Sequence, residues 1–237
     1  MVSLTPNQPY LTLRVKFKKV GSLQYISHLD LVRTMQKIIT RAKLPLWYTE
    51  GFNPKPKMIF AAPLSIGTES VAEYMDIRLV EDISPEEVKD RLNRNMTDEM
   101  QVLDAYYTNE KLTELKWLSY SINITTAGAS CELAKRCHEY LQSDNIVIDK
   151  KTKPGEPLKE QNIAPLIKEA DVEYSDGEIK VKCILSADAS AFLNPEYIVK
   201  ALKRGCGILS DPDLTKEYYS IMRLVGYRDD MTDFGIH

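Results

Sequence analysis

Two stretches near the N-terminus decide the fold: LTLRVKFK at residues 11–18 and SHLDLVRTMQKIITRA at residues 27–42. Apolar and polar residues alternate in the first stretch, which predicts a half-buried β-strand. Apolar residues recur at helical spacing in the second stretch: Leu31, Met35, Ile38 and Ala42. Ser27, followed three residues later by Asp30, resembles a helix N-cap with an acidic third residue. The chain is therefore expected to begin with a strand and an amphipathic helix over residues 28–42.

Further signals complete one structural unit. They predict a short strand near residues 46–48, a strand at 74–79, a helix that starts at Ser84-Pro85-Glu86-Glu87, and a strand at 101–107. Pro54 and Pro56 exclude a helix or a central strand in the loop that follows residues 46–48. The order strand, helix, strand, strand, helix, strand is the ferredoxin-like pattern. It predicts a first domain over residues 10–109.

The second half of the chain repeats this order. Its expected elements are a strand at residues 118–124, a helix from Ser130, a strand at 145–149, a hairpin at 172–185, a helix from Asn194 to Gly205 and a strand at 218–225. Asp176-Gly177 is a strong hairpin-turn signal. The sequence therefore predicts an α+β protein of two tandem ferredoxin-like (βαββαβ) units with antiparallel sheets, the second over residues 115–226. Residues 150–157 are expected to form a long surface loop.

The composition is that of a globular protein and excludes several functional classes. The 237 residues are 43% hydrophobic and 27% charged. The longest apolar run, residues 58–64, is far shorter than the roughly 20 residues of a membrane span, and no secretory signal is visible. The four cysteines lack CxxC or cluster spacing, so we expect reduced thiols and no cofactor or metal. A cytoplasmic location is expected.

The charges are distributed unevenly along the chain. Residues 10–60 contain ten lysines and arginines but only two acids, Asp30 and Glu50, whereas the whole chain has a net charge of −3. This asymmetry favours a polyanionic partner for the first domain. The alternative is a solvated basic face that balances acidic neighbours in the fold.

Basic and aromatic residues of the first domain form a candidate RNA interface. Its members are Arg14, Lys16, Lys18, His28, Arg33, Lys37, Arg41, Tyr48, Asn53, Lys55 and Lys57. Arg33, Lys37 and Arg41 recur every four residues and so share one helix face, where like charges repel by about 0.2–0.5 kcal/mol per pair. The proline-containing loop is expected to be a rigid lip beside the N-terminus of that helix. Nearby aromatic residues would suit single-stranded or looped RNA, although Trp47 and Phe52 are equally consistent with core positions.

His28 is a candidate catalytic residue. A histidine at a helix start has its protonation disfavoured and suits a neutral general base. Ferredoxin-like RNA endonucleases that process CRISPR repeats also place a histidine near their first helix. No catalytic partner is evident in the sequence, so a structural role is favoured, and Tyr25 and Tyr48 are possible helpers only. Phosphate-binding glycine loops, nucleophile elbows and zinc motifs are absent from the sequence.

Two motifs carry a resemblance to a known family. They are Ile26-Ser27-His28-Leu29-Asp30-Leu31 with Arg33, and Tyr48 to Lys57 continuing through Phe60-Ala61-Ala62-Pro63-Leu64-Ser65-Ile66-Gly67. Together they resemble the bacterial radical-SAM-linked protein family, a domain of unknown function that occurs alone or fused behind a radical-SAM enzyme. Lys55 departs from the histidine that members often carry between the two prolines, which argues against a required metal-binding or acid–base histidine there.

The resemblance implies a radical-SAM enzyme as the partner, one that modifies RNA. We therefore expect an accessory RNA-binding protein that presents a basic surface, with tRNA or rRNA as the RNA. The alternatives are a metal-independent RNA endonuclease that uses His28 and a protein–protein adaptor that binds no nucleic acid. No catalytic residue is assigned, and an enzyme is the less favoured reading.

Overall fold

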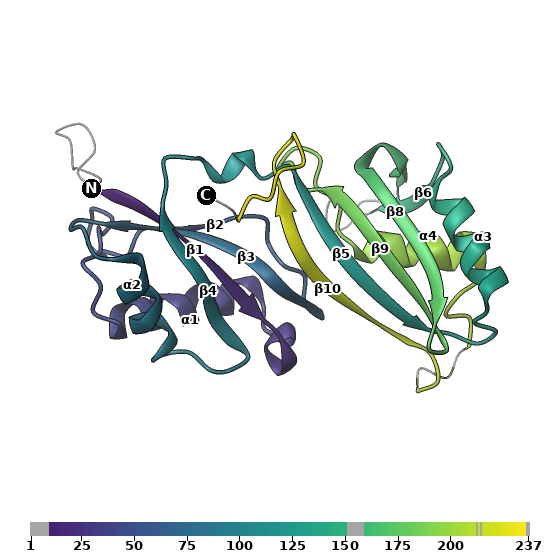
Figure 1. The fold of residues 1–237 in the computed structure, drawn as a ribbon, viewed down its shortest axis with the longest axis horizontal. Coiled ribbons are helices and arrows are strands. Elements are labelled where there is room, and N and C mark those ends of the chain that lie inside the picture. The colour runs from purple at the N-terminus through teal and green to yellow at the C-terminus, as the bar shows by residue number, and fades with distance from the viewer. Residues whose placement is uncertain (1–9, 151–158, 212, 214, 236–237) are drawn as a thin grey trace. The chain divides into compact units, whose positions relative to one another are not determined.

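The computed structural model describes residues 10–150, 159–211, 213 and 215–235 (Figure 1). These residues divide into two compact units. The first comprises residues 10–115 together with 233–235, and the second comprises the described residues of 116–232. The assignment of residues 233–235 to the first unit was not part of the sequence expectation.

The first unit is one antiparallel sheet with two α-helices. Its elements are β1 (Leu11–Lys19), the short 3₁₀ helix η1 (Gly21–Tyr25), α1 (His28–Arg41), β2 (Met58–Phe60), β3 (Thr68–Leu79), α2 (Pro85–Asn93), β4 (Met100–Tyr107) and the 3₁₀ helix η2 (Leu112–Glu114). The strands lie in the order β4-β1-β3-β2. Both α-helices lie on one face of the sheet (Figure 1).

The apolar alternation of β1 builds the core of this unit. Leu13, Val15 and Phe17 are fully buried, and they pack with the α1 residues Leu31 and Met35 in one hydrophobic cluster. Each such side chain contributes about 1.5–3 kcal/mol through its removal from water. The neighbouring β1 positions therefore face the side of the sheet that lacks helices.

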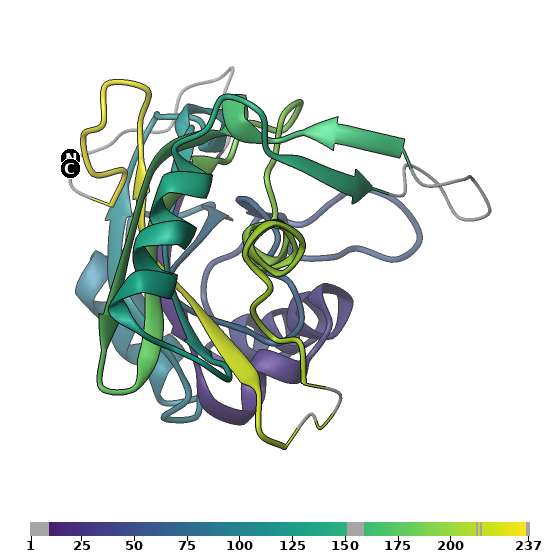
Figure 2. The same cartoon turned by 90° about the vertical axis from the view of Figure 1, so that its right-hand side faces the viewer.

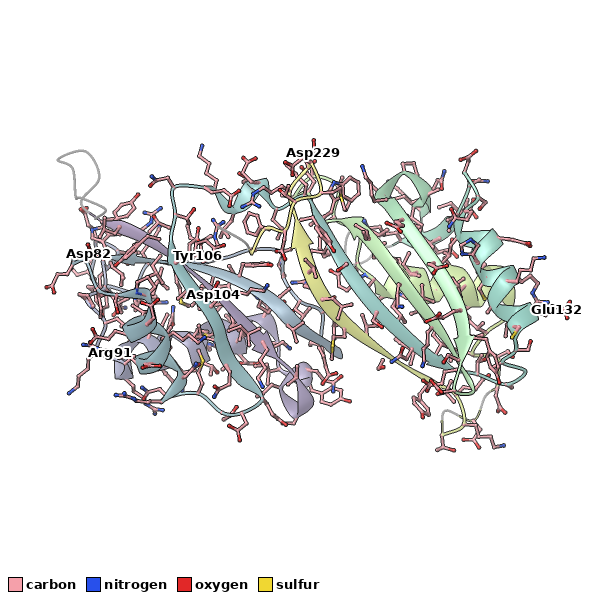
Figure 3. The ribbon with its side chains drawn as sticks, viewed as in Figure 1. Asp82, Arg91, Asp104, Tyr106, Glu132 and Asp229 are labelled. Carbon is pink, nitrogen blue, oxygen red and sulfur yellow. The ribbon has the colours of Figure 1, made fainter. Side chains whose placement is uncertain are left out.

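The helix starts that the sequence predicts are confirmed. The Ser27 hydroxyl accepts a hydrogen bond from the Asp30 amide at 3.2 Å and donates one to the Asp30 carboxylate at 2.7 Å. The first of these bonds satisfies an amide that has no partner within the helix, and the second holds the Ser27 hydroxyl in place. Ser84 caps α2 in the same way by accepting from the Glu87 amide. Arg91 of α2, which is labelled in Figure 3, pairs with Glu87 one turn earlier and donates to the Lys43 carbonyl at 3.1 Å.

The prediction of a strand at residues 46–48 is wrong. Leu46 and Tyr48 form only isolated bridges, Leu46 to the last residue of β3, and the strand that pairs with β3 is residues 58–60. Residues 47–57 fold back on themselves: the Lys57 amide donates to the Trp47 carbonyl at 3.0 Å. We call residues 47–57 the proline hairpin. Proline lacks an amide proton, so Pro54 and Pro56 limit the length of any ladder here.

The second unit has the same kind of architecture. Its elements are β5 (Trp117–Thr125), α3 (Cys131–Leu141), β6 (Val147–Lys150), β7 (Lys159–Asn162), the 3₁₀ helix η3 (Ala164–Leu166), β8 (Ile167–Ser175), β9 (Glu178–Ser186), α4 (Glu196–Cys206) and β10 (Tyr218–Tyr227). Four strands form an antiparallel sheet in the order β10-β5-β9-β8. The predicted hairpin is confirmed, because Asp176 and Gly177 both take positive φ, at 56° and 84°.

Two expectations for the second unit need correction. The strand expected at residues 145–149 exists as β6, but it pairs with β7 in a separate ribbon beside α4 (Figure 2). The helix expected to end at Gly205 continues to Cys206, and Gly207 takes the left-handed conformation that ends it. A Cβ at Gly205 would lie 2.4 Å from the Tyr140 ring, so this glycine permits close packing of α4 against α3. Apart from Lys150, the loop expected at 150–157 lies outside the described residues.

The described chain is thus a mixed α/β protein with antiparallel sheets and four α-helices. None of the described helices has the length and apolar character needed to cross a membrane. All four cysteines are free, and Cys137, Cys183 and Cys206 are buried. Burial raises the pKa of Cys183 to about 12, which keeps this thiol protonated and unreactive at neutral pH.

Candidate nucleic-acid interface

The outer face of α1 carries three exposed cations. Arg33, Lys37 and Arg41 all face solvent, opposite the buried stripe of the helix. They line a shallow depression of about 400 Å³ together with Gln36 and Thr40. Arg33 also lies 3.5 Å from Asp30, but both side chains are more than half exposed, and such surface pairs contribute about 0.5 kcal/mol or less. The helix therefore presents a row of accessible positive charge, which we call the α1 basic row.

The proline hairpin presents aromatic side chains to solvent. Phe52 at its tip is fully exposed, and Tyr48 is 41% exposed. Asn53 and Lys55 are exposed beside them, and Lys57 is half-buried. The Thr49 amide donates to the Lys55 carbonyl at 2.9 Å, which closes the hairpin below this tip. Phe52 is thus not a core residue, and its ring is available for stacking.

The proline hairpin lies at the opposite end of α1 from the one expected. The Trp47 amide donates to the Arg78 carbonyl, and the Arg78 amide donates to the Lys57 carbonyl, at the C-terminal end of β3. The N-terminal end of α1 lies elsewhere, where the His28 ring meets the Phe60 ring edge-on at 5.5 Å. Leu46, which follows the end of α1 at Arg41 by five residues, bridges Leu79 at this same end of β3, so Arg41 is at the hairpin end.

The cations of β1 do not join the α1 basic row. Lys16 and Lys18 are half-buried, and Lys16 Nζ lies 6.0 Å from the centre of the Tyr74 ring. Lys16 is paired in register with Tyr74 on the sheet face that lacks helices. The structure therefore places these two lysines apart from the helix cations rather than in one continuous surface.

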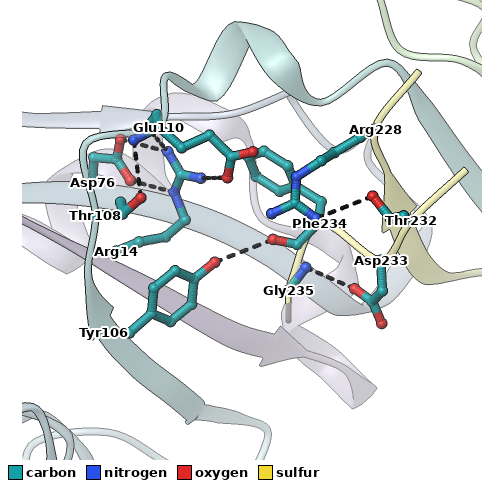
Figure 4. Close-up of polar contacts among 10 residues, drawn as sticks. All are labelled: Arg14, Asp76, Tyr106, Thr108, Glu110, Arg228, Thr232, Asp233, Phe234 and Gly235. Carbon is teal, nitrogen blue, oxygen red and sulfur yellow. Dashed lines mark hydrogen bonds and ion pairs between the residues drawn. The ribbon is translucent and has the colours of Figure 1, made fainter. Parts of the chain in front are cut away.

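The assignment of Arg14 to an exposed surface is wrong. Arg14 is fully buried, and its guanidinium binds Asp76 through two hydrogen bonds of 2.8 and 3.1 Å (Figure 4). It also donates to the Glu110 carboxylate at 3.0 Å and to the Glu110 carbonyl at 2.6 Å. Its Cζ lies 4.5 Å from the centre of the Phe234 ring. With these partners, Arg14 cannot contact a phosphate.

Burial and pairing act in opposite directions on the Arg14 cluster. Burial alone lowers the pKa of Arg14, but the hydrogen bond and charge of Asp76 raise that pKa above its ordinary value. Burial raises the pKa of Asp76, and the hydrogen bond and charge of Arg14 oppose this rise. We take both groups as charged at neutral pH, because the two-pronged geometry matches a guanidinium with a carboxylate.

His28 is exposed on the first turn of α1. Its ring packs against Phe60, and the structure shows no hydrogen bond or ion pair to it from the described residues. Tyr25, which the sequence suggested as a second catalytic residue beside His28, lies three residues earlier in the chain, and its side chain is 68% exposed. The described residues also contain no group of three or more His, Cys, Asp or Glu side chains placed to hold a metal ion. The arrangement is that of a packed surface histidine.

Comparison with solved structures gives information on the fold alone. One chain of a crystal structure of a Cbf5-Nop10-Gar1 complex matches with a TM-score of 0.50 and 10% identity, over 92% of this chain and 50% of that chain. This chain therefore spans half the length of the chain it matches. An unknown protein from Galdieria sulphuraria matches at 7% identity over 91% of this chain and 99% of that chain, with a TM-score of 0.25. DyPB from Rhodococcus jostii RHA1 matches at 10% identity over 92% of this chain and 91% of that chain, with a TM-score of 0.21.

No curated protein matches the sequence significantly. A family model matches residues 12–195, which is well over half of the chain. Its description agrees with the expected bacterial domain of unknown function, and the link to a radical-SAM enzyme stays a prediction. The chain belongs to the family of uncharacterized proteins conserved in bacteria that is designated DUF2344.

Proposed function

We propose that this protein is an accessory RNA-binding protein that works with a radical-SAM RNA-modifying enzyme. The observation that carries the RNA-binding part is the α1 basic row around its depression. Three cations at helical spacing repel one another, so helix stability gives no reason for the row. A phosphate chain would relieve this repulsion and release its own counterions.

The proline hairpin favours single-stranded or looped RNA as the ligand. Phe52 exposes its whole ring at the hairpin tip, with Lys55 beside it. Unpaired bases stack on such rings, whereas the bases of a duplex are already stacked on each other. The hairpin lies at the Arg41 end of the α1 basic row, so one strand could contact both. We propose tRNA or rRNA, which both contain single-stranded loops.

The enzyme partner is proposed from the resemblance to the radical-SAM-linked family. The four free cysteines lack the spacing that holds a radical-SAM cluster, so a second polypeptide would supply that chemistry. The protein–protein adaptor is the main competitor, because an acidic protein would also fit a basic row. The endonuclease is less favoured, because His28 packs on Phe60 and shows no described catalytic partner.

The strand orders support a ferredoxin-like description of both units. The first unit has the order β4-β1-β3-β2, and the second has β10-β5-β9-β8. In each, the fourth strand of a βαββαβ series lies beside the first, followed by the third and the second. The β6–β7 ribbon is then an insertion between α3 and β8 in the second unit.

The α1 basic row is tested by removing its charges. The triple variant Arg33→Ala, Lys37→Ala, Arg41→Ala should bind labelled single-stranded RNA more weakly than the wild type. Each lost phosphate contact lowers the slope of log affinity against log salt by about 0.7, so the slope should fall by about 2. Fluorescence anisotropy over a salt series measures both quantities.

The matched control removes three exposed lysines from the second unit: Lys135, Lys182 and Lys203. It changes the net charge by the same amount. Because these lysines lie outside the α1 basic row, the control should leave the salt slope near the wild-type value. An equal loss in both triple variants would mean that only net charge matters. Absence of RNA binding by the wild type would favour the adaptor.

The stacking role of the proline hairpin is tested at Phe52. Because its ring is fully exposed, Phe52→Ala should leave stability unchanged while it weakens RNA binding by about 1–3 kcal/mol, the contribution of one stacked base. Phe52→Trp should keep the affinity, since it keeps an aromatic face. The same anisotropy assay applies, and equal affinity of the alanine variant and the wild type would rule out stacking at this position.

A further inference from the structure

A pocket of about 550 Å³ opens on the sheet face of the first unit that lacks α-helices. Its walls come from β1, β2 and β3 and from residues 108–113, which follow β4. Thr12, Ile59 and Asp76 contribute to it, and they alternate with the core residues that face the helices. Ligand sites in proteins commonly have volumes of about 300–1,000 Å³. The size is therefore that of a site for a small molecule or one residue of a polymer.

The charges that remain available in this pocket are positive. The two carboxylates in its wall, Asp76 and Glu110, are both bound by the buried Arg14. The other charged lining residues are Arg78 and Lys111, and Lys111 is exposed. An anionic group would therefore be drawn toward Arg78 and Lys111, whereas a cationic ligand would find its carboxylates already engaged.

Arg78 is held in position by aromatic rings. Its Cζ lies 4.1 Å from the centre of the Tyr10 ring and 5.5 Å from that of Trp47. A guanidinium stacked on rings keeps the N–H groups at its edge free to donate to a phosphate in its own plane. Trp47 and Lys57 also fix the Arg78 backbone by hydrogen bonds. The base of the proline hairpin thus forms part of the support for this pocket.

The remaining walls combine apolar and neutral polar groups. Ile59 is 43% exposed, although it lies on a strand, and Leu112 also lines the pocket. Thr12, Asn109 and Thr113 add hydroxyl and amide groups. This combination suits a flat base on the apolar side, a sugar or base edge at the polar groups and a phosphate at the cations.

We propose that this pocket binds one ribonucleotide, with its phosphate at Arg78 and Lys111 and its base against Ile59 and Leu112. This inference rests on the proposed RNA-binding function and extends it with a site for a single residue. The proline hairpin connects the two places, because its tip carries Phe52 and its base contacts Arg78. The ribonucleotide is either a free nucleoside monophosphate or a residue of the bound RNA strand.

Isothermal titration with 5′-AMP, GMP, CMP and UMP tests the site on the full chain. The wild type should bind at least one of them at millimolar concentrations or below. Arg78→Gln should weaken that binding by about tenfold or more, the effect of losing one hydrogen bond to a charged group. Lys111→Ala should weaken it in the same direction, and Lys111 is an exposed residue whose loss does not threaten folding. The triple variant Lys135→Ala, Lys182→Ala, Lys203→Ala of the second unit should bind mononucleotides as well as the wild type does.

The outcomes separate this inference from the proposed function. Failure of all four mononucleotides to bind, or binding that both pocket variants retain, would overturn the pocket while leaving RNA binding by the α1 basic row intact. Loss of mononucleotide binding in the pocket variants alone would support the pocket. This holds even if the triple variant of the α1 basic row kept its RNA affinity. A trinucleotide that binds more tightly than the monophosphates would identify the RNA strand as the source. Equal affinity would identify the free nucleotide.

Discussion

Replacing Arg14 with alanine is expected to lower the free energy of unfolding of the first unit by about 3–5 kcal/mol. Removing one partner of a buried ion pair leaves the other charges without compensation, and that is the measured range for such losses. Here the residual charges are Asp76, 8% exposed, and Glu110. The cavity left by the side chain adds to the cost.

Urea unfolding measures this effect when it is followed by Trp47 fluorescence in a Trp117→Phe background. The chain has two tryptophans, and Trp47 lies in the first unit while Trp117 lies in the second. Arg33→Ala is the matched control, since Arg33 is exposed and should change stability by about 0.5 kcal/mol or less. A loss below about 1 kcal/mol for Arg14→Ala would contradict the buried cluster.

A paired variant separates charge burial from packing. Arg14→Met with Asp76→Leu removes both main charges and retains much of the volume. Buried ion pairs are often replaced by apolar groups at little cost, so this double variant should be more stable than Arg14→Ala alone. Greater destabilisation in the double variant would mean that the side chains act mainly through shape.

The parts of the fold that sequence reasoning found are those with local causes. The alternation of β1 and the caps at Ser27 and Ser84 depend on residues within a few positions of each other. The Asp176-Gly177 turn is local in the same way. Sequence reasoning missed that residues 58–60 form the edge strand, because this depends on which distant residues pair with β3 in the sheet. The pairing of β6 with β7 was missed for the same reason.

The candidate interface shows the same division. The α1 basic row follows from spacing within one helix, so the sequence could reveal it. The burial of Arg14 depends on its register with Asp76, which is 62 residues away in the chain. No alternation rule separates Arg14 from Lys16, because both occupy polar positions of one strand. The sequence offered one signal: Arg14 is a charged residue on a predicted strand for which no partner had been assigned. That signal could have prompted a search for a buried partner of Arg14.

Two features of the site needed the three-dimensional structure. The position of the proline hairpin at the C-terminal end of α1 depends on the hydrogen bonds of Trp47 and Lys57 with Arg78. The ribonucleotide pocket is assembled from four separate segments of the chain. Residues 233–235 have no periodic pattern, so nothing in the sequence assigned them to the first unit.

Phe234→Ala is expected to destabilise the first unit by about 3–5 kcal/mol, the usual range for truncating a buried phenylalanine. Phe234 is fully buried. Its ring meets Tyr74 edge-on at 5.0 Å, and Arg14 lies over its face. The Tyr106 hydroxyl donates to the Phe234 carbonyl at 3.2 Å, which holds the backbone at the same place (Figure 4).

Phe52→Ala provides a control with the same chemical change. Phe52 is fully exposed, so its truncation should alter the unfolding free energy by about 0.5 kcal/mol or less.

Phe234→Leu should recover part of the stability, since it restores apolar volume but neither the ring contact with Tyr74 nor the attraction to Arg14. Because Arg14 and Phe234 touch, their alanine variants should combine non-additively, with a double variant less destabilised than the sum of the two. Equal effects of Phe234→Ala and Phe52→Ala would show that residues 233–235 do not stabilise the first unit.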